Sequence, residues 1–152
     1  MAWQEPKTDW KAGDAPSSGD FNRIEGNIEE LDKPLYGVTS GAANNYVVSV
    51  DGIRGYNPGL KIAVKIHVAS TGASTINVNG LGAKTIKKPN GNNATNLKAN
   101  GVYTLVYDGI NFILQGEGGE GNAQPGDVLK GKTFTNDDDV QTGTLELAGT
   151  AT

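Results

Sequence analysis

Residues 61–68 have the sequence KIAVKIHV, and this alternation of polar and apolar side chains decides the fold class. Ile62, Val64, Ile66 and Val68 would share one face of an extended strand, because successive side chains point to opposite faces. Polar or small residues fill the opposite face, as in a strand that is buried on one side only. The pattern predicts a half-buried β-strand in the middle of the chain.

Short runs of the same kind predict further strands on both sides of this one, over residues 46–50, 75–79, 84–87, 102–107 and 112–115. Asp108-Gly109 lies between the last two runs, and Asp-Gly between apolar runs is a strong hairpin signal. Clusters of Gly, Pro and Asn separate the other runs. Residues 36–116 are therefore predicted to form a small antiparallel β-sandwich or barrel-like domain.

The composition excludes several classes of function. The chain has 152 residues, no Cys, one His and a formal net charge of −4. Without Cys there is no disulfide, thiolate metal site or thiol nucleophile, and a single His does not make a zinc site. An acidic chain is a poor partner for nucleic acid, and no apolar run approaches the roughly 20 residues that span a bilayer. We expect no cofactor, no metal, no nucleic-acid partner, no membrane insertion and no enzymatic activity.

Two residue types that could suggest chemistry have simpler interpretations. His67 is expected to lie exposed on the polar face of its strand, not to act as a catalytic base. Asp137, Asp138 and Asp139 lack the alternate spacing of an EF-hand loop, so a solvated turn is favoured over a calcium site.

Residues 1–16 are predicted to form an extended arm, because Pro6 and Pro16 disfavour helix. The arm carries Trp3 and Trp10 but has no core of its own. Tryptophan is enriched at the centres of protein interfaces. We interpret Trp3, Pro6 and Trp10 as anchoring residues. The alternative is that the tryptophans fold back on the β domain.

Residues 18–32 are predicted to form a helix, with Ser17 and Asp20 as a capping box and Ser18 as an alternative cap. The apolar residues of this helix are spaced by three, four and three positions, as in a heptad seam: Phe21, Ile24, Ile28 and Leu31. Gly26 weakens a helix that is short enough to be marginal alone. The seam therefore needs a partner surface, either on its own domain or on identical helices of other chains. Together, residues 1–35 form a predicted anchoring segment.

Residues 117–124 are predicted to be a glycine-rich linker, and residues 125–152 a separate β element. Val128-Leu129, Thr133-Phe134 and residues 144–147 could form short strands. The segment has too few apolar residues for its own core. We therefore expect Val128, Leu129 and Phe134 to pack against copies of the same chain or against neighbouring parts of the sequence.

Motifs along most of the chain resemble parts of phage tail fibres. Residues 3–10 (WQEPKTDW) and 20–28 (DFNRIEGNI) resemble the N-terminal segment of tail-fibre and baseplate-attached proteins of phages of Gram-positive hosts and related contractile particles. Residues 37–44, 69–82 and 107–112 resemble small β domains of such fibres. Residues 126–134 and 142–145 resemble a shaft element.

The resemblance implies a homotrimer that attaches to baseplate or tail proteins by its N terminus. It implies a structural tail-fibre or adaptor subunit that positions host-recognition parts. Its location would be a virion tail or an extracellular tail-like particle, assembled in the bacterial cytoplasm. The alternative function is a carbohydrate-binding module for host cell-wall glycans, with an exposed platform of tyrosines: Tyr46, Tyr56, Tyr103 and Tyr107.

Overall fold

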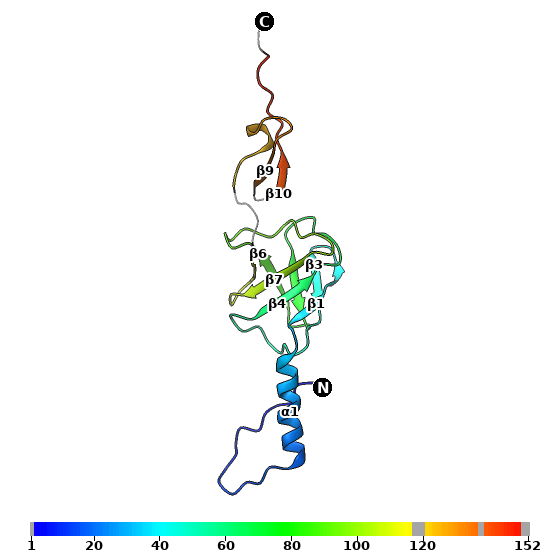
Figure 1. Ribbon diagram of the computed structural model, residues 1–152, viewed down its shortest axis with the longest axis vertical. Helices are drawn as coiled ribbons and strands as arrows, with labels where there is room; N and C mark the ends of the chain where they lie inside the picture. Colours follow the sequence, from blue (N-terminus) through cyan, green and yellow to red (C-terminus); the bar gives the residue numbers. More distant parts are fainter. Residues whose placement is uncertain (1, 117–120, 137–138, 150–152) are drawn as a thin grey trace.

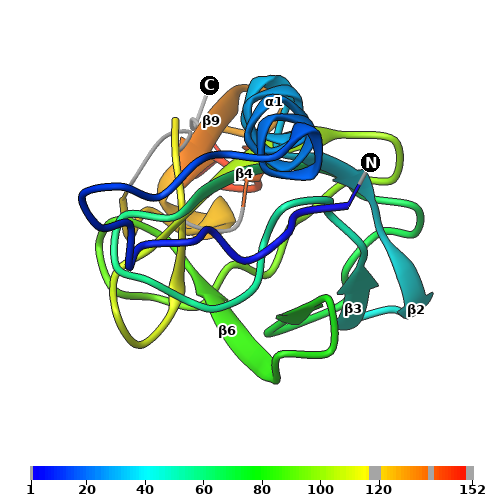
Figure 2. The same ribbon diagram turned by 90° about the horizontal axis from the view of Figure 1, so that it is seen from below.

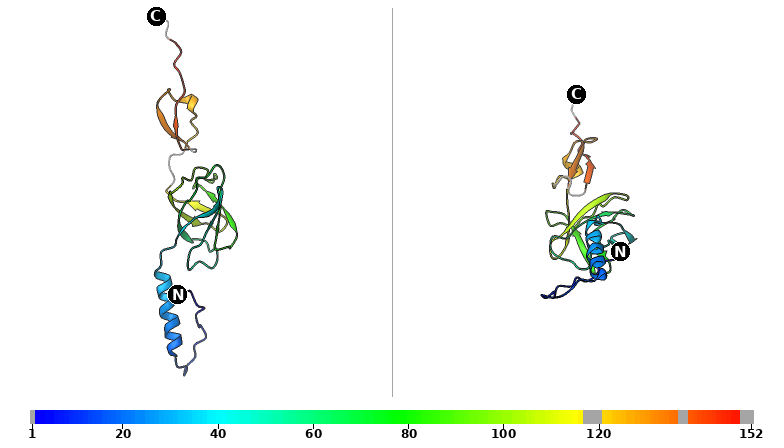
Figure 3. Two further views of the ribbon diagram at one scale, coloured as in Figure 1. Left: turned by 90° about the vertical axis from the view of Figure 1, so that its right-hand side faces the viewer. Right: turned by 60° about the horizontal axis from the view of Figure 1, so that its bottom comes forward.

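The computed structural model describes residues 2–116, 121–136 and 139–149, and it is mainly β as predicted. Three parts follow one another along its longest axis (Figure 1). A helix with its N-terminal arm lies at one end, a barrel-like sheet in the middle, and a two-stranded element at the other end (Figures 1 and 3). Residues 117–120 of the expected linker and residues 137–138 of the expected acidic turn lie outside the described residues.

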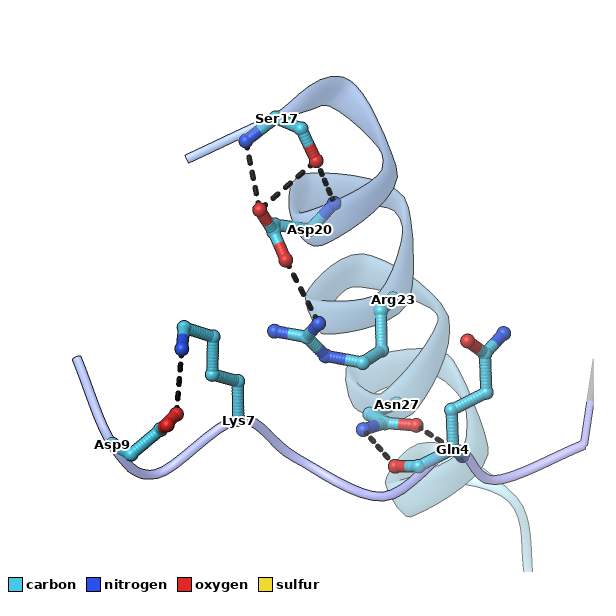
Figure 4. A network of polar contacts seen from close by, with 7 residues as sticks. All are labelled: Gln4, Lys7, Asp9, Ser17, Asp20, Arg23 and Asn27. Carbon is cyan, nitrogen blue, oxygen red and sulfur yellow. Dashed lines mark hydrogen bonds and ion pairs between the residues drawn. The ribbon is translucent and has the colours of Figure 1, made fainter. Parts of the chain in front are cut away.

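The helix α1 (Ser18–Asp32) has the predicted bounds. The Ser17 hydroxyl accepts a hydrogen bond from the Asp20 N–H at 3.1 Å, and the Asp20 carboxylate accepts one from the Ser17 N–H at 2.8 Å. The predicted capping box is thus confirmed (Figure 4). The hydrogen bonds from Ser17, followed by that from Arg23, hold the pKa of Asp20 below its usual value.

Eight strands form one nearly closed sheet: β1 (Tyr36–Val38), β2 (Ser40–Ala42), β3 (Asn45–Val48), β4 (Lys61–Lys65), β5 (Thr75–Val78), β6 (Ala83–Lys87), β7 (Val102–Tyr107) and β8 (Phe112–Leu114). Their order is β1-β4-β7-β8-β6-β5-β3-β2. The pairs β1–β4, β3–β5 and β6–β8 are parallel, so the prediction of an antiparallel domain is wrong for them. Each of these pairs is separated along the chain by at least one other strand, which provides the crossover that parallel pairing requires.

Alternation along β4 places its apolar residues inside the barrel. Ile62, Val64 and Ile66 are fully buried, but the strand ends at Lys65 and Val68 is 37% exposed. The prediction of a strand to Val68 is therefore wrong at its C-terminal end. The His67 N–H donates to the Thr39 hydroxyl at 3.0 Å and not to a neighbouring strand, so the sheet pairing stops there.

A glycine on β1 allows two strands to approach closely inside the barrel. Gly37 is buried, and a Cβ at this position would lie 2.5 Å from Val48 Cγ2 and 2.7 Å from the Ser49 carbonyl oxygen. Any side chain here would have to displace this part of the sheet. Gly37 is thus a packing requirement of the β1–β4 edge.

Asn79 ties the long loop after β3 to the end of β5. Its side-chain oxygen accepts from the Val50 N–H, and its side-chain nitrogen donates to the Val50 and Ile53 carbonyl oxygens, all at 2.8 Å. Asn79 adopts φ of 53°, a left-handed conformation that Asn tolerates better than most residues. The same loop carries Arg54, which contacts the N-terminal arm.

The predicted hairpin after β7 is confirmed. The Asp108 N–H donates to the Asn111 carbonyl oxygen at 3.0 Å, and one carboxylate oxygen accepts from the N–H groups of Asn111 and Ile110. These backbone hydrogen bonds, that from Asn111 first, hold the pKa of Asp108 below its usual value. Gly109 takes the positive φ that the turn needs.

The C-terminal element differs from the prediction. It contains a 3-10 turn, η1 (Pro125–Asp127), and an antiparallel pair, β9 (Thr133–Asn136) and β10 (Asp139–Thr142). Leu129 and Leu145 form only an isolated bridge, so the strands expected at Val128-Leu129 and over residues 144–147 are not formed. Gly143 is buried, and a Cβ at this position would overlap the carbonyl oxygens of Val128 and Leu129, so the two segments approach closely there.

Candidate functional site: the N-terminal segment

The apolar stripe of α1, formed by Phe21, Ile24, Ile28 and Leu31, is exposed along its whole length. The four side chains are 57%, 42%, 57% and 73% exposed. In a single chain the predicted heptad seam is thus in contact with water. The structure does not show the seam docked on the chain's own domain, which was one of the two alternatives.

The opposite side of α1 is covered by the N-terminal arm. Gly26, Asn27 and Glu30 are the buried residues of the helix. The Gln4 N–H donates to the Asn27 side-chain oxygen at 2.9 Å, and the Asn27 side-chain nitrogen donates to the Gln4 carbonyl oxygen at 2.8 Å (Figure 4). The side-chain amide of Asn27 therefore pairs with both backbone groups of Gln4, as the backbone of a neighbouring β-strand would. At 3.6 residues per turn, the centre of the apolar stripe lies about 130° around the helix from this buried set.

Trp3 lies where the arm, α1 and the barrel meet. The Arg54 guanidinium lies 4.2 Å from the centre of the indole ring, and Arg54 also forms an ion pair with Glu5 at 2.9 Å. Trp3 lines a cleft of about 470 Å³ together with Leu31 and Leu35. The Trp3 indole thus folds back on its own chain, as the alternative interpretation held.

The other two residues of the predicted anchor are exposed. Trp10 is 39% exposed, with the Lys7 ammonium 5.0 Å from the centre of its ring. Pro6 is exposed on the same arm. Trp10 and Pro6 are therefore available to a partner, whereas Trp3 is engaged within the chain.

An ion-pair group links the end of α1 to the barrel. Lys33 contacts the Glu30 carboxylate at 2.8 Å and the Asp51 carboxylate at 3.9 Å. The hydrogen bond from Lys33 lowers the pKa of Glu30, and the same hydrogen bond raises the pKa of Lys33. Because Asp51 belongs to the loop after β3, Lys33 helps to set the direction in which α1 leaves the barrel.

The predicted oligomerisation residues of the C-terminal element are only partly exposed. Leu129 is 42% exposed, and Val128 and Phe134 are half-buried. Part of the small core expected from other chains is thus formed within the element itself.

The described residues contain no cluster of three or more His, Cys, Asp or Glu side chains that could hold a metal. His67 is exposed as predicted, but it follows β4 and does not lie on it. Its two ring nitrogens contact the Thr39 hydroxyl at 2.8 Å and the Gly41 carbonyl oxygen at 2.9 Å. These contacts fasten β2 to the end of β4. No described helix is both long and apolar enough to cross a membrane.

The predicted tyrosine platform is not formed. Tyr46 and Tyr107 are buried, and Tyr56 and Tyr103 are half-buried against the same core. Tyr46, Tyr103 and Tyr107 share the inward parity of their strands, and the ring of Tyr56, in the loop after β3, packs against Tyr107 and Phe112. Sequence alternation alone does not reveal which face of a strand is the inner one.

Sequence reasoning missed a second exposed apolar surface, on the outside of the barrel. We call it the barrel patch; it consists of Leu35, Tyr36, Val38 and Val102, which are 37%, 44%, 54% and 60% exposed. The sequence does not distinguish this surface, because β7 carries apolar residues on both of its faces and alternation does not reveal which face is the inner one.

In comparisons with known proteins, the chain matches no family model, and no curated protein matches it at a significant level.

Proposed function

We propose that this chain is a non-catalytic structural subunit of a phage-type tail, a fibre or adaptor protein that attaches by its N-terminal segment. The observation that carries the proposal is the apolar stripe of α1, whose four side chains are 42–73% exposed. A short helix with such a stripe is stable only when another surface covers it, since most helix stability in proteins comes from packing of the apolar face.

The arrangement of the parts supports the same function. The arm and α1 lie at one end, and the C-terminal element lies at the other, with the barrel as a spacer between them (Figure 1). Trp10 and Pro6 on the arm are available for a baseplate or tail protein, and the stripe is available for identical helices in a homotrimer. The arm is held against α1 by Asn27 and against the barrel by Arg54, so a load on the arm would reach the barrel.

The proposal is tested by incorporation into particles. A tagged chain is expressed in a bacterium that produces phage-type tails, and the purified tails are probed for the tag. We expect the full chain to copurify with tails and a chain lacking residues 1–33 to be lost from them, with the barrel still folded by circular dichroism.

Single variants sharpen this test. Trp10→Ala should reduce incorporation, whereas Leu81→Ala, at an exposed apolar position of the barrel, should leave it unchanged. Tails that retain the chain without residues 1–33, or that never contain the full chain, would contradict the proposal.

A further inference from the structure

The residues of the barrel patch on β1 and β7 flank β4, and α1 lies on the β4 side of the barrel (Figure 2). Seen from below, α1 lies over the β4 side of the barrel, away from β6 and β3, and the arm runs along its inner side (Figure 2). The stripe points away from the arm and therefore outward. Leu35 and Tyr36 follow α1 directly in the chain and connect the two surfaces.

The barrel patch spans three neighbouring strands. Register places Val38 of β1 beside Lys65 of β4, and Lys65 beside Val102 of β7. In the next row of outward positions, Tyr36 of β1 lies beside Ala63 of β4, and Ala63 lies beside Thr104 of β7. Large apolar side chains thus occupy outward positions of β1 and β7, on both sides of Lys65, although a solvated sheet face would carry mainly polar ones.

The combined area matches that of a stable interface. The eight side chains of the stripe and the patch are on average about half exposed. If each offers about 180 Å² when fully exposed, together they leave roughly 750 Å² of apolar surface, close to the roughly 800 Å² per partner of a specific interface. The stripe alone leaves only about 400 Å², which is too little.

Charge opposes a second copy in the same orientation, and it therefore predicts how added salt would act on such an arrangement. Residues 1–35 carry eight acidic and four basic side chains, residues 36–116 two and seven, and residues 117–152 seven and two, giving net charges of −4, +5 and −5. Copies side by side in the same direction would place like charges together. Lys65, within the patch, would then extend its ammonium to the rim, as long side chains do.

We propose that the stripe and the barrel patch form one continuous interface between parallel, in-register copies of this chain. The inference rests on the proposed function for the role of α1 and adds the outer face of β1, β4 and β7 to the contact. Apolar burial drives the association against like-charge repulsion. Added salt, which screens that repulsion, should therefore strengthen it. A staggered arrangement would bring opposite charges together and would be weakened by salt.

The first experiment is sedimentation velocity of the full chain over a range of concentrations and of sodium chloride. Val38→Asp/Val102→Asp should raise the dissociation constant at least tenfold. The matched control Val47→Asp/Leu81→Asp adds the same charge at exposed apolar positions of the β3–β5 side and should change it less than twofold. Unchanged melting by circular dichroism establishes that each variant is folded.

The second experiment locates the contact. Because the chain has no Cys, single variants allow site-specific cross-linking with a short bismaleimide. Val102→Cys and Ile24→Cys should each link two copies, and Val47→Cys should do so at least fivefold less.

Three outcomes would overturn the inference: a full chain that stays monomeric, an association that salt weakens, or equal effects of the patch and control variants. If association is lost on Ile24→Asp/Ile28→Asp but survives the patch variant, the stripe alone is the interface. The proposed function then stands while this inference fails.

Discussion

Replacing Asn79 should destabilise the barrel more than any other exposed polar substitution in the β5 turn. Asn79→Ala removes three hydrogen bonds of 2.8 Å to backbone groups of Val50 and Ile53, two residues that are 1% and 7% exposed. A hydrogen bond contributes about 0.5–1.5 kcal/mol net. Alanine at a φ of 53° adds about 1 kcal/mol of backbone strain. The expected loss is therefore about 2.5–5.5 kcal/mol.

Two further variants separate the two contributions. Asn79→Gly removes the hydrogen bonds, but glycine adopts the positive φ without strain. This variant should therefore lose about 1 kcal/mol less of the free energy of unfolding than Asn79→Ala. Asn100 also has a positive φ, of 64°, but its side chain forms no hydrogen bond to any described residue. Asn100→Ala should therefore show the strain alone, about 1 kcal/mol.

The assay is urea unfolding of the full chain followed by far-ultraviolet circular dichroism, with thermal melting as a second measure. For a barrel of this size, a loss of 3 kcal/mol lowers the melting temperature by about 12–24 °C. The slope of the free energy of unfolding against urea concentration should be unchanged, because the same surface is exposed on unfolding. If Asn79→Ala and Asn100→Ala lose the same free energy, the side-chain hydrogen bonds of Asn79 contribute nothing and the reasoning is refuted.

Three other predictions concern packing, capping and pH. Gly37→Ala should lower the free energy of unfolding by about 1–3 kcal/mol in the same urea assay, because its Cβ would overlap Val48. Unchanged stability would mean that β1 shifts to accommodate the methyl group without loss of free energy. Ser17→Ala should weaken α1 by about 1 kcal/mol, seen as faster amide hydrogen exchange in its first turn, whereas Ser17→Asn should restore protection. Because the pKa of Asp108 is lowered in the folded chain, its carboxylate stabilises the hairpin at neutral pH, and this contribution is lost as pH falls from about 4 through the lowered value. Asp108→Asn should thus be less stable than the wild type at pH 7, and the difference should shrink in acid; a difference independent of pH would contradict the assignment.

Local patterns were sufficient for the elements that rest on local chemistry. The bounds of α1 follow from the Ser17 cap, the apolar spacing and Pro34, all of which act within a few residues. The hairpin at Asp108-Gly109 and the buried residues of β4 follow from turn chemistry and from a period of two. The exposed stripe was also predicted as a surface in need of a partner.

Contacts between distant segments decided what the sequence did not reveal. The parallel pairs of the sheet depend on crossovers by intervening strands, and no residue pattern within β1, β3 or β6 indicates them. Trp3 folds back because the loop after β3 brings Arg54 to it, a contact across 51 positions of sequence. The tyrosines point inward because barrel closure selects one face of each strand as its interior.

The sequence by itself determined a mainly β centre and a capped helix with an apolar seam. Those properties depend on spacing and residue type, which act locally. Only the tertiary structure decided that α1 lies on the β4 side of the barrel (Figure 2), between whose neighbours β1 and β7 the outward valines are divided. The direction in which α1 leaves the barrel depends on contacts between segments far apart in the chain, the Lys33–Asp51 ion pair and the contacts of Arg54 with Glu5 and Trp3.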